Sequence, residues 1–127
     1  ALPLLEASRR GRAIAVGAFG PHVWRTDLPS FPATAAAKAA LEATVRALAL
    51  KLGPCGATAN VVAPGFIEKD AGTHAAVTAE AAAELTGCIP MARRGTPAEV
   101  AAVIVFLSSL EASYVTGQVI HVNGGLI

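Results

Sequence analysis

The stretch Phe31-Pro-Ala-Thr34-Ala-Ala-Ala-Lys38-Ala-Ala-Leu41 opens a long helical segment. Proline is favoured in a first helical turn, alanine is the best helix former, and Gly53-Pro54 ends the run. We therefore predict a helix over residues 32–52. Thr34 and Lys38 stand four residues apart, which places their side chains on one face of that helix.

Short apolar runs and helical segments alternate on both sides of this helix. The runs typical of buried strands cover residues 13–18, 58–63 and 117–122, and the helical segments cover residues 1–10, 76–86 and 96–109. Ser30 is expected to cap the long helix, and Thr96-Pro97-Ala98-Glu99 has the pattern of a capping box. Strands separated by helices pair in parallel, so the pattern predicts an α/β layer fold.

Composition limits the kinds of protein this can be. With 127 residues, 54% of them hydrophobic and 15% charged, the sequence describes one globular domain at most. The net charge is +1, and the patch at Arg9-Arg10-Gly11-Arg12 is too short for a nucleic-acid-binding face. No apolar run reaches 18 residues and no signal-peptide layout is present, so we expect a cytoplasmic protein without membrane contacts. Two cysteines and three scattered histidines show no metal-ligand spacing, so no metal site is expected.

Four segments, in this order and spacing, resemble the carboxy-terminal half of the short-chain dehydrogenase/reductase family, nearest to its 3-oxoacyl-reductase-like members. They are the Thr34–Lys38 helix start, Pro64-Gly65 after a strand that contains Asn60, Pro90–Val100, and Ser113–Gly125. The resemblance covers nearly the whole chain. It implies that residues 1–127 form the carboxy-terminal part of one Rossmann-like domain with a doubly wound parallel sheet, of which about three strands lie here.

The resemblance also implies NAD or NADP as cofactor. Lys38, Pro64, Gly65 and Ile67 match positions beside the nicotinamide and its ribose, while Lys69 stands near a position where the family often has a threonine that contacts the cofactor. The glycine-rich phosphate turn of the family belongs to its amino-terminal half, and these 127 residues contain no such turn between a strand and a helix. A bound dinucleotide is therefore expected only if that half is present.

The catalytic positions of the family are altered. Its tyrosine stands four residues before the lysine, where this sequence has Thr34, and its serine aligns with Ala18. A threonine hydroxyl is a far weaker acid than a phenol, and alanine has no donor, so Lys38 has no phenol whose pKa it could lower. His22 and Asp27, in the loop between these positions, are alternative proton donors.

Three functions remain open at this point. The first is a non-catalytic or impaired subunit that stabilises an oligomer of short-chain-dehydrogenase-fold subunits. The second is an active NAD(P)-dependent reductase or dehydrogenase of the 3-oxoacyl type with atypical acid–base residues. The third is a small-molecule sensor. In the family the helix at 32–52 is the main subunit interface, which implies a homo- or hetero-oligomer here. Its small residues could pack on such a partner, on the chain's own sheet, or on both: Ala35, Ala36, Ala39, Ala40, Ala43 and Ala47.

Overall fold

A three-stranded parallel sheet forms the centre of the computed structural model, which describes residues 2–68 and 79–126. The strands are β1 (Arg12–Val16), β2 (Thr58–Pro64) and β3 (Val119–Val122), in the order β1-β2-β3. Both pairings are parallel, with Ala15 opposite Val61 and Val62 opposite Ile120. The α/β class and the parallel sheet predicted from the sequence are thus confirmed.

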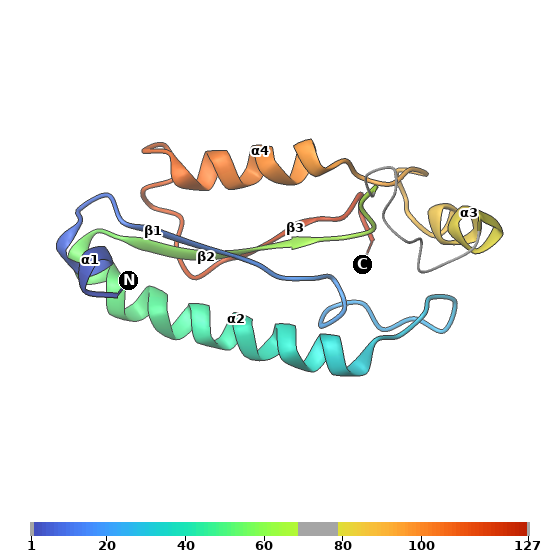
Figure 1. The fold of residues 1–127 in the computed structure, drawn as a ribbon, viewed down its shortest axis with the longest axis horizontal. Coiled ribbons are helices and arrows are strands. Elements are labelled where there is room, and N and C mark those ends of the chain that lie inside the picture. The colour runs from blue at the N-terminus through green and yellow to red at the C-terminus, as the bar shows by residue number, and fades with distance from the viewer. Residues whose placement is uncertain (1, 69–78, 127) are drawn as a thin grey trace.

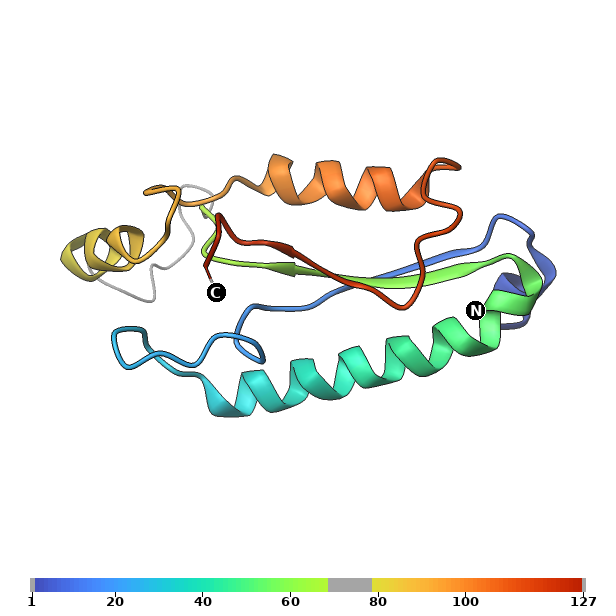
Figure 2. The same ribbon diagram turned by 180° about the vertical axis from the view of Figure 1, so that it is seen from behind.

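Helices cover both faces of the sheet (Figure 1). The long helix α2 (Pro32–Leu52) lies along one face, and α4 (Pro97–Ser108) lies along the other. The short helix α1 (Leu2–Ala7) lies near the end of α2, and α3 (Ala79–Gly87) lies beyond the end at which the strands finish, an arrangement also visible from behind (Figure 2). This is the doubly wound layering that the resemblance implied.

Two apolar layers hold the helices to the sheet, and β2 contributes to both. Val61 belongs to the cluster under α2, together with Val45 and Leu52, whereas Val62 belongs to the cluster under α4 with Leu107. Successive residues of a strand point to opposite faces, so a strand covered on both sides is expected to be mostly apolar. This explains why β2 was visible in the sequence as a largely apolar run, with Thr58 and Asn60 as its polar residues.

Some element boundaries differ from the sequence predictions. The first strand spans 12–16 instead of 13–18, and the last begins at Val119. The cap predicted at Ser30 is wrong: the residue before the first helical residue, Pro32, is Phe31, and it makes no side-chain capping bond. Ser30 is one residue too far from the helix for that role. Residues 76–78 of the predicted third helix lie outside the described residues, and α3 is described from Ala79.

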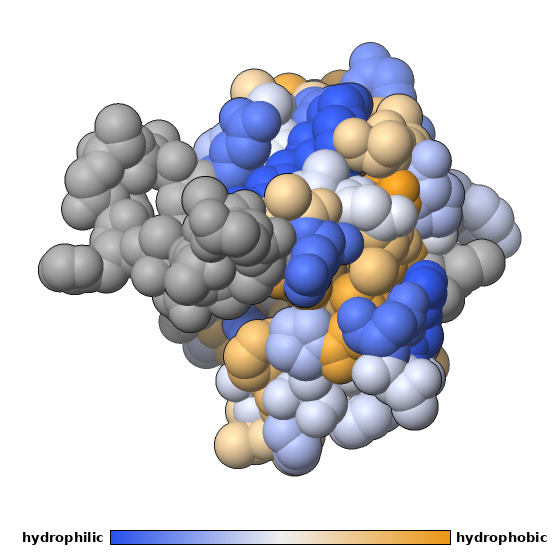
Figure 3. Space-filling model, turned by 90° about the vertical axis from the view of Figure 1, so that its right-hand side faces the viewer, coloured by the Kyte–Doolittle hydropathy of each residue, from blue (hydrophilic) through white to orange (hydrophobic). Residues whose placement is uncertain are grey.

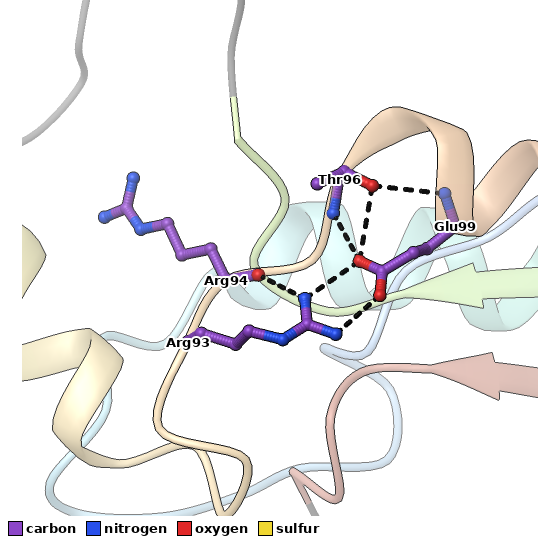
Figure 4. A network of polar contacts seen from close by, with 4 residues as sticks. All are labelled: Arg93, Arg94, Thr96 and Glu99. Carbon is purple, nitrogen blue, oxygen red and sulfur yellow. Dashed lines mark hydrogen bonds and ion pairs between the residues drawn. The ribbon is translucent and has the colours of Figure 1, made fainter.

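The capping box predicted for α4 is confirmed, and an arginine extends it (Figure 4). Glu99 N–H donates to Thr96 Oγ1 at 3.3 Å, while Thr96 N–H donates to Glu99 Oε2 at 2.8 Å. Arg93 places both Nη atoms on the same carboxylate, at 3.0 and 2.5 Å. These contacts, with the Arg93 hydrogen bonds foremost, lower the pKa of Glu99 from 4.5 to about 2. The network fixes the turn that leads into α4.

Candidate functional site

The segment after β1 continues alongside β2 and brings the two strand ends together. Gly17 N–H donates to Val62 O at 2.7 Å, and Phe19 N–H donates to Pro64 O at 3.1 Å. Ala18, which the sequence predicts to occupy the position of the family's serine, lies between these two hydrogen bonds. The carboxyl ends of parallel strands lie at the same end of the sheet, and in open α/β sheets ligands bind at this end.

The side chain of Lys38, on α2, reaches the same end of the sheet. Its Nζ donates to the carbonyl oxygen of Val16, the last residue of β1, at 2.8 Å. Thr34 lies one turn earlier, as the third residue of the helix, and is exposed. The structure therefore brings Ala18, Lys38 and Pro64 to one edge of the sheet, with Thr34 a turn away along α2.

Position 65 requires glycine, because two backbone segments approach each other closely there. Its N–H donates to Val122 O at 3.0 Å, and a Cβ at this position would lie 2.7 Å from Asn123 Cα. Ile67, predicted to contact the cofactor, forms an isolated bridge with Gly95 before α4. Lys69 lies outside the described residues. Pro64 and Gly65 thus remain at the strand ends with Lys38, while Ile67 lies against the segment that leads to α4.

Apolar side chains cover part of this end of the molecule, where they lie between hydrophilic residues (Figure 3). The rings of Phe19 and Phe66 contact each other in a tilted arrangement, with centroids 4.8 Å apart and ring planes 52° apart. Val23, Leu28, Leu85 and Leu126 form the buried centre of the same cluster. This cluster joins the loop after β1 to α3 and to the carboxyl-terminal turn.

A polar contact that the sequence analysis did not predict ties the same loop to α2. His22 Nε2 lies 2.8 Å from Glu42 Oε1, and Glu42 is only 3% exposed. One signal was available: residues 35, 38, 42, 45, 49 and 52 follow the three-and-four spacing of a buried helix face, and Glu42 is the one carboxylate among them. A charged residue in such a stripe is expected to have a buried partner.

The carboxylate of Asp27, the other alternative proton donor, is bound by the guanidinium of Arg25. The carboxylate receives hydrogen bonds from Arg25 Nε at 2.9 Å and from Nη2 at 2.6 Å. The hydrogen bond from Arg25 lowers the pKa of Asp27 below its ordinary value of 3.8. Asp27 is therefore a carboxylate at neutral pH and has no proton to donate.

A pocket of about 270 Å³ is lined by residues of the 91–99 segment, of the end of β3 and of the carboxyl-terminal turn. Arg93, Glu99, His121 and Asn123 supply its polar side chains. Within residues 2–68 and 79–126, no group of three His, Cys, Asp or Glu side chains is arranged to hold a metal ion. In the same residues, no helix is long and apolar enough to cross a membrane.

The sequence and the fold both match known reductases. A family model described as enoyl-(acyl carrier protein) reductase matches residues 1–127. The 3-oxoacyl-[acyl-carrier-protein] reductase of Vibrio harveyi is 41% identical over 118 residues, which are 93% of this chain and 46% of that protein. This chain belongs to the short-chain dehydrogenase/reductase family. It spans about half the length of the curated relatives it matches.

Solved structures of the family superpose closely on the described fold. A 3-oxoacyl-[acyl-carrier protein] reductase from Brucella melitensis gives a TM-score of 0.84 at 37% identity, with 98% of this chain and 45% of that one covered. Another crystal structure of such a reductase from that organism, with bound NAD, gives 0.81 at 36% identity over 98% and 44% of the two chains. The short-chain dehydrogenase/reductase fold is therefore established for these residues.

Proposed function

We propose that this chain is the carboxy-terminal part of one domain of a cytoplasmic short-chain-dehydrogenase-type protein of the 3-oxoacyl class, impaired in hydride transfer and acting as a subunit of an oligomer. The observation that carries the proposal is the set of groups around Lys38. Its ammonium donates to Val16 O at 2.8 Å, the nearby strand end carries the methyl group of Ala18, and Thr34 supplies only a short alcohol. Among the described residues, no phenol lies at this edge, since the chain's one tyrosine, Tyr114, precedes β3.

The chemistry of carbonyl reduction explains why these changes impair the reaction. Hydride delivery to a carbonyl carbon leaves a developing alkoxide, which needs a proton donor and a hydrogen bond at the oxygen. Ala18 can supply neither, and a threonine hydroxyl is too weak an acid to replace a phenol. Loss of a general acid or base costs ~10²–10⁴-fold in rate. Lys38 can still hold a hydroxyl of a ribose.

The cofactor that this edge would hold is NAD or NADP. Lys38, Pro64 and Gly65 would contact its nicotinamide riboside portion, and Ile67 would lie farther along the same turn. The dinucleotide would supply the hydride. Its binding requires a glycine-rich segment that the 127 residues do not contain. A companion segment or polypeptide with that turn is therefore part of the proposal, and native mass spectrometry of the purified protein would detect a separate polypeptide.

Restoring the missing groups tests the loss of catalysis. Reduction of a 3-oxoacyl thioester is followed through NAD(P)H absorbance for the protein with any companion polypeptide, for Thr34→Tyr with Ala18→Ser, and for the double variant with Lys38→Met added. We expect background turnover from the unmodified protein and a rate at least ~10²-fold higher from the double variant. Lys38→Met should remove that gain. Turnover by the unmodified protein that the double variant does not exceed would contradict the proposal.

The outer face of α2 supports the oligomer. Ala35 and Ala49 are buried on the sheet side, whereas the other small residues named from the sequence are exposed along the helix: Ala36, Ala39, Ala40, Ala43 and Ala47. Leu50 continues this strip and is 82% exposed. Small side chains let two helices approach closely, so a second short-chain-dehydrogenase-fold subunit fits this face.

A charge placed in this strip tests the interface. Ala43→Glu should shift the sedimentation coefficient of the protein toward that of the dissociated subunit, because the carboxylate would be desolvated between two helices. Ala83→Glu, on the exposed side of α3, is the matched control and should leave it unchanged. An Ala43→Glu protein that sediments like the parent would exclude α2 as the interface.

A further inference from the structure

The outer edge of β3, which is coloured red in Figure 2, has no strand partner among the residues that the structure describes. Gly65 N–H donates to Val122 O at 3.0 Å, so the main-chain groups of Val122 face β2. In a parallel ladder with this register, those of Ile120 also face β2, whereas the N–H and C=O groups of Val119 and His121 face outward. The edge therefore presents two donors and two acceptors to another strand.

The sequence of β3 does nothing to prevent such pairing. Edge strands of soluble proteins usually carry a lysine, a proline or a bulge that blocks it, whereas β3 reads Val-Ile-His-Val. Partial burial lowers the pKa of His121, the neighbouring His22 lowers it further, and Glu42 opposes the shift. The ring of His121 is therefore neutral at neutral pH. Two such strands can lie opposite each other without like charges meeting.

Apolar side chains are exposed beyond both ends of this edge. Residues 121–125 help to line the cavity of about 270 Å³, and Met91 lines it with them. Met91 is 60% exposed, and its N–H donates to Gly124 O at 3.1 Å, which holds it beside the carboxyl end of β3. Tyr114, in the turn that leads into the other end of the strand, is fully exposed. The edge is thus flanked by a thioether at one end and by an aromatic ring at the other.

We propose that the outer edge of β3 pairs antiparallel with β3 of a second copy of this chain across a twofold axis, so that one sheet runs through both copies. Such a contact is self-complementary, because each outward N–H of one copy meets an outward C=O of the other. The antiparallel arrangement places the start of one strand beside the end of the other. Tyr114 of each copy then approaches Met91 of the other, and contacts between a thioether and an aromatic ring are favourable.

This contact is separate from the exposed strip on α2. It rests on the proposed function only in that the protein is an oligomer, and it names the partner at this edge as a second copy of the same chain. A twofold contact through α2 and another through β3 together give a closed assembly of four copies.

Proline at position 121 tests the main-chain pairing. His121→Pro removes an outward N–H and leaves the hydrogen bonds of Ile120 and Val122 to β2 in place. His121→Thr is the matched control, because it removes the same ring and its contact with His22 but keeps the N–H. In analytical ultracentrifugation, we expect the mass of the assembly to fall about twofold for His121→Pro and to keep the parent value for His121→Thr. Equal masses for all three proteins, or an equal loss in both variants, would overturn the proposal.

Ala43→Glu separates this contact from the one proposed for α2. If both contacts form, Ala43→Glu and His121→Pro each leave a dimer, and the combined variant leaves single subunits. If only the α2 contact is absent, Ala43→Glu keeps the parent mass while His121→Pro still lowers it. If only the β3 contact is absent, His121→Pro keeps the parent mass while Ala43→Glu still lowers it.

A measurement on the unmodified protein covers the case in which His121→Pro does not fold. In an equimolar mixture of isotope-labelled and unlabelled copies, NMR filtered for contacts between copies should connect the His121 amide of one copy to β3 of the other. Hydrogen exchange should show the Val119 and His121 amides as protected as that of Ile120, with this protection lost on dilution. Fast exchange of the His121 amide at every concentration would overturn the proposal. Protection without a contact between copies would also overturn it and would place a different chain at this edge.

Discussion

Single polar residues inside the core decide how the last strand is attached to the sheet. Asn60, in the middle of β2, is fully buried. Its Nδ2 donates to Val115 O at 2.8 Å, and its Oδ1 accepts from Gln118 N–H at 3.0 Å. Both partners belong to the turn before β3. Thr58 on the same strand is also buried, but its Oγ1 has no hydrogen-bond partner among the described residues.

These two positions give opposite predictions. Asn60→Leu should lower the free energy of unfolding by about 1–3 kcal/mol, because a partly buried carbonyl and a partly buried N–H lose their partners. Thr58→Val, which removes an unpaired hydroxyl at constant shape, should be neutral or slightly stabilising. Urea unfolding followed by circular dichroism measures both. A similar loss for the two variants would show that the Asn60 hydrogen bonds do not hold the turn.

Gly65 gives a second prediction at this scale. Gly65→Ala places a methyl group 2.7 Å from Asn123 Cα, so the end of β2 must move away from the carboxyl-terminal turn. Overpacking of this kind costs about 1–3 kcal/mol. Gly87→Ala, where a Cβ meets nothing within 4 Å, is the matched control. Equal urea midpoints for Gly65→Ala and the parent would contradict the close approach.

At the scale of elements, helix ends differ in how they are fixed. The long helix α2 starts without a side-chain cap and is held by its buried stripe, whereas α4 depends on its capping box and on Arg93. The same stripe of α2 contains Lys38 and Glu42. The ammonium of Lys38 contacts the end of β1, and the carboxylate of Glu42 contacts the loop between β1 and α2. A single helix therefore positions both polar features at this end of the molecule.

The network at α4 predicts a pH dependence. The pKa of Glu99 is about 2 in the folded protein against 4.5 for the free side chain, so its stabilising contribution is complete above pH 4.5 and is lost as the pH falls toward 2. The difference in urea midpoint between the parent and Glu99→Gln should therefore shrink from pH 6 to pH 3. Glu84→Gln, on the exposed side of α3, should differ little from the parent at either pH. A midpoint difference that is constant with pH would contradict this role of the Glu99 charge.

At the scale of the whole molecule, the sheet has one central strand and two edges. Among the described residues, β1 pairs only with β2, so every second N–H of β1 faces away from the sheet. β2 is paired on both sides and buried on both faces. The two apolar layers meet at this strand, which makes it the most protected part of the fold.

Hydrogen exchange resolved by NMR tests this gradient. Amides of β2 should exchange slowest, and those of β1 should alternate between slow and fast along the strand. Binding of a companion segment beside β1 should remove the alternation. Uniformly slow exchange of β1 in the isolated chain would show that its outer edge is already paired, for example by a second copy.

The sequence alone determined the class of fold, the long helix and the capping box, and it predicts altered catalytic positions at Ala18 and Thr34. Each of these depends on local spacing: apolar runs covered on two faces, alanine periodicity, and residue types at fixed distances along the chain. The contacts of Lys38 with β1, of Gly65 with Asn123 and of His22 with Glu42 join residues 20 to 58 positions apart. They depend on how the loops fold back over the strand ends. No local pattern encodes that path, so the tertiary structure was needed to find it.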